Sequence, residues 1–140
     1  MSAQEIAPMM RGFAEQAVRL GREFKVHLDY SENSLQEVEH LLGRLHDDMS
    51  KSDANKIEEM AKIWGGYLGE VVRRHFGGEW SIEKYPAGDF LIVSLNVNGA
   101  RLFPSMKVHK RLTEGSNENI WSFYQAVRAK LQAQPGAKVQ

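Results

Sequence analysis

Apolar residues recur at spacings of three and four through the first half of the chain, which is the period of amphipathic helices. The first stripe is Ile6, Met10, Phe13, Ala17, Leu20 and Phe24, and the second is Leu35, Val38, Leu41, Leu42, Leu45 and Met49. Pro8 fits only the first turn of a helix, so we expect the first helix to begin near it. Ser34 and Glu37 have the spacing of a capping box at the start of the second helix.

A third stripe passes through three glycines without losing its period. Its members are Ile57, Met60, Ala61, Trp64, Leu68, Val71, Val72 and His75. Gly65, Gly66 and Gly69 each cost about 1 kcal/mol relative to Ala in a helix interior. A helix that keeps its period at that cost indicates close packing against bare backbone. We predict one helix from Ala54 to Phe76, with Ser52 or Asp53 as its N-cap and an end at Gly77-Gly78.

The pattern then changes to strands. Trp80–Tyr85 alternates apolar and polar residues, and Phe90–Val97 is predicted as a second strand that is more buried at its start. Asn98-Gly99 is a strong hairpin signal, after which Ala100–Phe103 returns as a third strand. A short helix or turn over Ser105–Leu112 and a final helix through Ile120 and Leu131 complete the order.

This order predicts an α+β fold with three N-terminal helices, a three-stranded antiparallel meander and one or two C-terminal helices. The third helix leads directly into the sheet, so we expect it to cover one face. We predict a single domain over residues 1–132 and a frayed C-terminal tail over residues 133–140.

Composition narrows the class of protein without naming a function. The 140 residues are 42% hydrophobic, carry 18 basic and 18 acidic side chains, and include no cysteine. Disulfides and cysteine-bound zinc are therefore excluded. The first ten residues lack the pattern of a signal peptide, and no apolar run has the length of a membrane span. We expect a cytoplasmic protein without membrane association.

Two short blocks carry a resemblance to a known family. Leu28-Asp29-Tyr30-Ser31, followed by Ser34-Leu35, and then Gly66-Tyr67-Leu68-Gly69-Glu70-Val71 with a downstream Trp80, resemble a small bacterial family of domains of unknown function. The similarity covers residues 28 to 130 and leaves the segment up to Lys25 outside. Such free-standing domains are often encoded beside antibacterial toxins as immunity proteins, so the resemblance implies a toxin as partner. It implies no catalytic residues.

No catalytic, metal or cofactor site is legible in the chain. A P-loop, a dinucleotide-binding Gly-x-Gly-x-x-Gly and a Gly-x-Ser-x-Gly elbow are all missing. His40 and His46 are about 120° apart on one predicted helix, and His75 lies on the apolar stripe as a hydrogen-bonded residue at the core edge. We expect no bound metal, no cofactor and no enzymatic activity.

Charge is distributed unevenly along the chain. Residues 31–60 hold eight acidic side chains against three basic ones, whereas residues 101–111 hold Arg101, Lys107, Lys110, Arg111 and no acid. The acidic helices could mask a basic active site of a partner, or the basic segment could instead contact phosphate. Phe103 is the only aromatic residue of the basic segment, which argues against single-stranded nucleic acid as a ligand.

Glu70 falls about 140° from the apolar stripe of its predicted helix. It is therefore either a solvated or salt-bridged glutamate, or a residue that faces another element or a partner. The residues that we assign to partner binding are Asp47, Asp48, Glu58, Glu59 and Glu70.

We predict a non-enzymatic immunity protein that occludes the active site of a cognate toxin. A small-ligand or nucleotide-binding domain, or a minor enzyme, with a pocket between the third helix and the sheet is the alternative. A homodimer stays open as a further arrangement.

Overall fold

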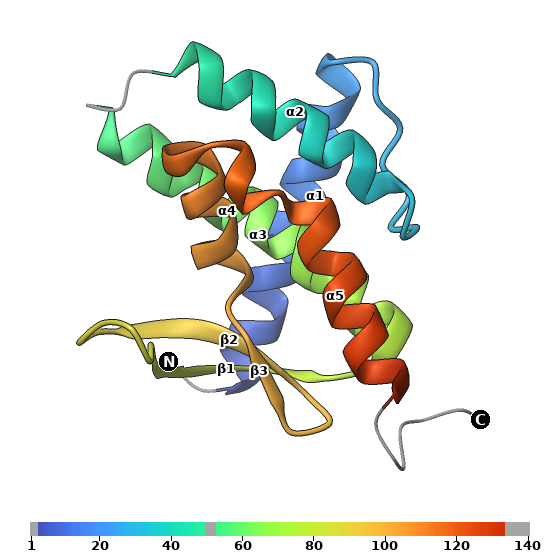
Figure 1. Ribbon diagram of the computed structural model, residues 1–140, viewed down its shortest axis with the longest axis vertical. Helices are drawn as coiled ribbons and strands as arrows, with labels where there is room; N and C mark the ends of the chain where they lie inside the picture. Colours follow the sequence, from blue (N-terminus) through green and yellow to red (C-terminus); the bar gives the residue numbers. More distant parts are fainter. Residues whose placement is uncertain (1–2, 50–52, 134–140) are drawn as a thin grey trace.

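Five α-helices, one 3₁₀ turn and a three-stranded sheet follow one another in the computed structural model, which describes residues 3–49 and 53–133 (Figure 1). The helices are α1 (Ala3–Glu23), α2 (Ser34–Asp48), α3 (Ala54–Phe76), α4 (Pro104–Glu114) and α5 (Ile120–Ala133), with η1 (Ser116–Glu118) before α5. The strands are β1 (Glu79–Lys84), β2 (Leu91–Val97) and β3 (Ala100–Leu102). The predicted α+β class and element order are confirmed. The predicted frayed tail covers residues 133–140; Ala133 is the last residue of α5, and residues 134–140 lie outside the described residues.

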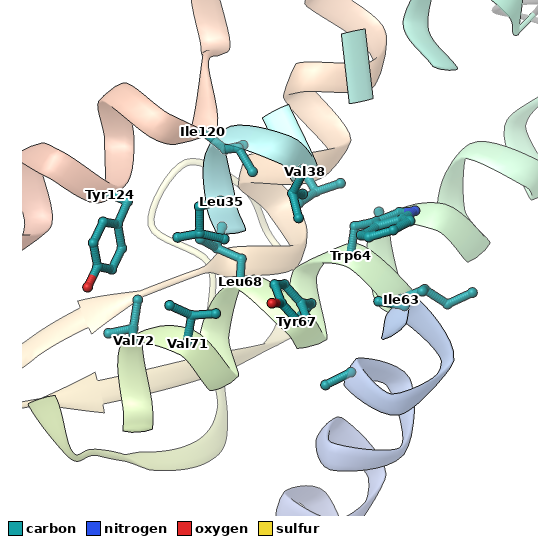
Figure 2. Close-up of a cluster of buried hydrophobic side chains, with 14 of the residues drawn as sticks. Leu35, Val38, Ile63, Trp64, Tyr67, Leu68, Val71, Val72, Ile120 and Tyr124 are labelled. Carbon is teal, nitrogen blue, oxygen red and sulfur yellow. The ribbon is translucent and has the colours of Figure 1, made fainter. Parts of the chain in front are cut away.

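Helix α3 runs through the middle of the molecule and packs against α1 and α4. Figure 2 shows Trp64, Leu68 and Val71 of α3 in one cluster with side chains of α2 and α5. The core draws buried apolar residues from all five of these helices and from β1 and β2. Asp53 caps α3 through its carboxylate, which accepts a hydrogen bond from the Lys56 amide at 3.3 Å.

The sheet has the order β1-β2-β3 and is antiparallel throughout. Asn98 and Gly99 have φ angles of 50° and 85°, so the predicted tight turn joins β2 to β3. Successive side chains of a strand point to opposite faces of the sheet, and Trp80, Leu95 and Val97 point to the buried face. Figure 1 shows the helices on one side of the sheet. The opposite face carries Glu83, whose carboxylate accepts hydrogen bonds from neighbouring polar side chains on all three strands.

Three local predictions need correction. Helix α1 begins at Ala3, so Pro8 lies beyond its first turn; the burial of Ile6 and Met10 holds the helix on both sides of the proline. Ser34 makes no capping box, because its hydroxyl bonds to other groups and Asn33 occupies the N-cap position. Strand β2 is exposed at its start and buried further along, the reverse of the predicted order, because the β1–β2 hairpin extends past the helical cover.

Candidate functional site

The glycines of α3 let three neighbours approach its backbone. A Cβ on Gly65 would lie 2.6 Å from Cα of Ser105 at the start of α4. A Cβ on Gly66 would lie 2.8 Å from Cβ of Phe13 on α1. Both distances are shorter than carbon atoms tolerate, so close helix packing explains both glycines. The third, Gly69, leaves room for an aromatic ring.

That ring belongs to Trp80 of β1, and it would overlap a Cβ on Gly69. The Trp80 indole Nε1 donates a hydrogen bond of 2.9 Å to Oε2 of Glu70. Arg73 donates to both carboxylate oxygens, at 2.8 and 3.0 Å, and Arg74 Nε lies 3.8 Å from Oε1. The carboxylate of Glu70 is therefore held between one indole and two guanidinium groups.

Glu70 is 0% exposed, so it offers no side-chain surface to a partner. Burial opposes its ionisation, but the hydrogen bonds from Arg73 and Trp80 outweigh this effect and lower the pKa of Glu70 below its ordinary value. Glu70 is not solvated; it is salt-bridged, as one interpretation predicted, and it also faces another element, Trp80 of β1, as the other predicted. Its assignment to partner binding is corrected as well: Glu70 fixes β1 and two arginines on α3.

Tyr67 is the centre of a second buried network on the same helix. Its hydroxyl accepts a hydrogen bond from the Tyr30 amide at 2.8 Å and lies 2.7 Å from the Ser34 hydroxyl. The ring centroids of Tyr30 and Tyr67 lie 4.9 Å apart, and Cζ of the Arg74 guanidinium lies 3.5 Å from the Tyr30 ring centroid. Burial raises the pKa of Tyr67, so its phenol stays protonated.

These two networks include residues that carried the family resemblance, namely Tyr30, Ser34, Tyr67, Glu70 and Trp80. They fasten the α1–α2 connection and β1 onto α3. His75 belongs to the same region, with Nε2 3.1 Å from the Tyr30 carbonyl oxygen, but its side chain is exposed rather than at the core edge. The glycine-containing segment Gly66–Val71 of α3 therefore stabilises the fold. A binding surface would lie elsewhere on the molecule.

The four other predicted partner residues are exposed, but they line different hollows. Glu58 and Glu59 border a hollow of about 260 Å³ between α1 and α3. Asp47 borders a hollow of about 790 Å³ between α2 and α4. Asp48, the next residue in the chain, is exposed to solvent and does not line that hollow. The structure therefore leaves these carboxylates available to a partner without gathering them in one hollow.

Partly buried polar contacts hold α2, α4 and α5 together, and Glu39, His46 and Arg111, which make them, line the larger hollow. Arg111 donates from Nε to Glu39 at 2.8 Å, and the other oxygen of Glu39 accepts the Ile120 amide at 2.9 Å. His46 Nδ1 lies 2.6 Å from the Leu112 carbonyl oxygen. Arg111 is thus a structural residue inside the molecule rather than part of a basic surface. In the part of the chain that the structure describes, no group of three or more histidine or carboxylate side chains could hold a metal ion.

An apolar groove lies between α3, β2 and α4. Its volume is about 390 Å³, and its walls are Glu58, Ala61, Lys62, Phe90, Leu91, Ile92, Val93, Ser105, Met106 and His109. Phe90 is 44% exposed and Leu91 72%. Sequence reasoning missed this surface, because the apolar run from Phe90 to Val93 was interpreted as the buried part of a strand. Exposed apolar side chains beside a groove are typical of a binding surface.

Comparison with known proteins shows a family but no activity. Residues 13–126 match the family described as Uncharacterised protein YwmA, so the similarity begins within α1 rather than after Lys25 as predicted. No curated protein and no solved structure matches the chain. Among residues 3–49 and 53–133, no helix is long and apolar enough to cross a membrane. The match covers most of the chain, and the protein therefore belongs to the family of uncharacterised protein YwmA.

Proposed function

We propose that the protein is a non-enzymatic protein-binding domain whose binding surface is the groove between α3, β2 and α4. The carrying observation is the exposure of Phe90 and Leu91 at its edge, since large apolar side chains are costly to leave in water. Glu58 lines this groove and also the neighbouring hollow that Glu59 borders. Lys62 lines the same two spaces, so the partner we infer presents an apolar side chain flanked by charged residues of both signs.

The finer proposal is that the partner is a cognate antibacterial toxin and that the protein acts in the cytoplasm as its immunity protein. Support for this class comes from the family resemblance, and the exposed carboxylates would suit a toxin with a cationic active site. Asp47, Asp48, Glu58 and Glu59 are all free to steer such a partner by charge.

The test begins with a toxin encoded beside this gene. Cells that produce the toxin should stop growing and should recover when the protein is produced with it. Leu91→Asp should abolish protection, because it places a charge in the apolar contact. Reversing Asp47, Asp48, Glu58 and Glu59 to Lys should slow association by about tenfold and weaken its salt dependence. Protection that survives both sets of changes would refute this surface.

A small-ligand or nucleotide-binding domain, with or without minor enzymatic activity, is the second candidate. The groove lies between α3 and the sheet, where that alternative predicted a pocket, and Lys62, Ser105 and His109 supply polar groups. A small ligand needs most of its surface buried, whereas Leu91 stays largely in solvent. This openness favours a protein partner. Stoichiometric binding of a small molecule that Lys62→Gln weakens and Leu91→Asp leaves intact would place the ligand in this groove and favour the second candidate.

A further inference from the structure

A fourth hollow, of about 240 Å³, lies where β3 meets α4, and it combines aromatic with cationic side chains. Its lining residues are Tyr85, Arg101, Leu102, Phe103, Met106, Lys107, Lys110, Glu118 and Phe123. In the sequence, Phe103 is the only aromatic residue of the basic segment. Folding adds Tyr85 from the end of β1 and Phe123 from α5. The sequence argument against base stacking therefore does not hold in space.

Two of the three aromatic rings of this hollow, those of Tyr85 and Phe103, pack against each other, and all three rings stay partly open. Tyr85 meets Phe103 edge to face at 5.2 Å between ring centroids, and it stacks on Phe90 at 5.4 Å. Tyr85, Phe103 and Phe123 are all half-buried. Rings held in this way can stack a flat ligand without first losing much side-chain entropy.

The charged groups around these rings favour an anion. Three cations line the hollow against one carboxylate, in a chain whose net charge is zero. Lys107 Nζ lies 5.5 Å from the Phe123 ring centroid, and Lys110 Nζ lies 6.0 Å from that of Tyr85. Glu118, 2.7 Å from Lys107 Nζ, and Glu83, 2.6 Å from Arg101 Nη1, form ion pairs with two of these cations. Lys110 makes no ion pair with the residues that the structure describes, so it carries the positive charge that is available to an anion.

We propose that this hollow binds a nucleotide unit, with the base stacked against Phe123 and the phosphate held by Lys107 and Lys110. Every base has a π-face, so aromatic stacking beside a basic groove recognises nucleotides with little sequence preference. Lysine ammonium groups bind phosphate through charge-assisted hydrogen bonds. The small volume suits one base with its sugar and phosphate at the mouth.

This site is separate from the proposed protein-binding groove, although Met106 lines both and so places them side by side on α4. The nucleotide site therefore does not depend on the proposed function. Its ligand could be a free nucleotide or one unit of a single strand, and the two share the same base and phosphate chemistry.

The test uses the purified full-length protein and three probes: adenosine monophosphate, inorganic phosphate and a labelled single-stranded DNA of about ten nucleotides. Calorimetry and fluorescence anisotropy at about 50 mM salt measure the affinities. We expect the nucleotide to bind at least about fivefold more tightly than phosphate, because phosphate cannot stack. Tighter binding of the oligonucleotide would identify a strand as the ligand, and weaker binding a free nucleotide.

Matched variants assign the binding to this hollow. Lys107→Gln with Lys110→Gln should weaken nucleotide binding about tenfold and reduce the salt slope, whereas Lys56→Gln with Lys130→Gln removes two exposed lysines elsewhere and should change neither. Phe123→Leu should weaken nucleotide binding about fivefold and leave phosphate binding unchanged. Absence of saturable nucleotide binding, equal affinity for phosphate, or equal behaviour of the two lysine pairs would overturn the proposal. The lysine pairs decide the matter even if Phe123→Leu lowers the melting temperature.

Discussion

Polar side chains are buried at the middle of α3, whereas large apolar side chains are exposed at the β1–β2 hairpin. At the middle of α3, a carboxylate and a phenol are removed from water, and Glu70 and Tyr67 each have hydrogen-bond partners there. At the hairpin, Phe90 and Leu91 remain in water although a groove lies beside them. Buried polar groups and exposed apolar groups are the two departures from average burial that carry information.

This difference distinguishes residues that stabilise the fold from residues that are available to bind a partner. A buried carboxylate is tolerable only when every nearby donor is in place, so the region around Glu70 has to keep its residues and its geometry. Phe90 and Leu91 are exposed side by side at a groove, and a contiguous apolar patch of this kind points to a partner. Substitutions at the middle of α3 should therefore lower the free energy of unfolding, whereas a substitution at the exposed hairpin should leave it nearly unchanged.

Gly69→Leu should lower the free energy of unfolding by about 3 kcal/mol, because the added side chain and the Trp80 indole cannot occupy the same space. The control is Gly12→Ala in α1, where a Cβ would meet nothing within 4 Å. That change should raise stability by about 0.5–1 kcal/mol through helix propensity. Chemical denaturation measures both. Similar effects at the two positions would contradict the packing role of Gly69.

Glu70→Leu should cost about 2 kcal/mol, because it leaves the buried Nε1 of Trp80 without an acceptor. Arg73 and Arg74 are partly exposed and can turn to water, so they limit the loss. Glu59→Leu changes an exposed glutamate on the same helix and should stay within about 0.5 kcal/mol. Equal losses of unfolding free energy at Glu70 and Glu59 would contradict a stabilising role of the buried Glu70 carboxylate.

The same carboxylate should make stability depend on acid. The pKa of Glu70 is lowered in the folded state, so its ionised form stabilises the fold above the unfolded pKa of about 4.3. That contribution should be lost as the pH falls through the lower folded pKa. Glu70→Gln should show a weaker decline over this acidic window than the parent protein, measured as unfolding free energy against pH. An unchanged profile would exclude Glu70 as the titrating group.

Tyr67→Phe should cost about 1–1.5 kcal/mol, since it removes the acceptor for the Tyr30 amide and a hydrogen-bond partner of Ser34. Hydrogen exchange at the Tyr30 amide should accelerate as well. Tyr30→Phe is the matched control, because it keeps that amide and the ring contacts with Tyr67 and Arg74. If both variants were equally stable, the phenol would not hold the α1–α2 connection.

Leu91→Asp should change stability least, by about 0.5 kcal/mol or less, because the side chain is already 72% exposed. A loss of partner binding without a loss of stability would sharpen the contrast with α3. Binding by titration and melting by circular dichroism measure the two effects on one sample. A large drop in melting temperature would instead make Leu91 part of the core and remove the main support for the groove.

Much of the fold could be predicted because its signals are local. The bounds of α3, Ala54 and Phe76, follow from an N-cap aspartate, an unbroken apolar period and a glycine stop, all within one segment. The Asn98-Gly99 turn follows from the left-handed φ angles that these two residues tolerate. The resemblance likewise pointed to residues that proved to lie together.

Helix periodicity failed at Glu70 because it assumes that one side of a helix faces water. Helix α3 has α1, α4 and β1 around its middle, so the side opposite the apolar stripe is buried too. Likewise, the apolar run at Phe90 predicted burial, but whether a strand end is covered depends on how far the helices reach.

By itself, the sequence determined the order of the elements, the need for bare backbone on α3 and the turn that closes the hairpin, since propensity and hydrogen bonding to near neighbours decide these features. Only the tertiary structure decided that Glu70 is enclosed, that Leu91 is open and that Tyr85 and Phe123 join the basic segment of α4. Those outcomes depend on contacts between residues far apart in the chain, and no local pattern records which elements will meet.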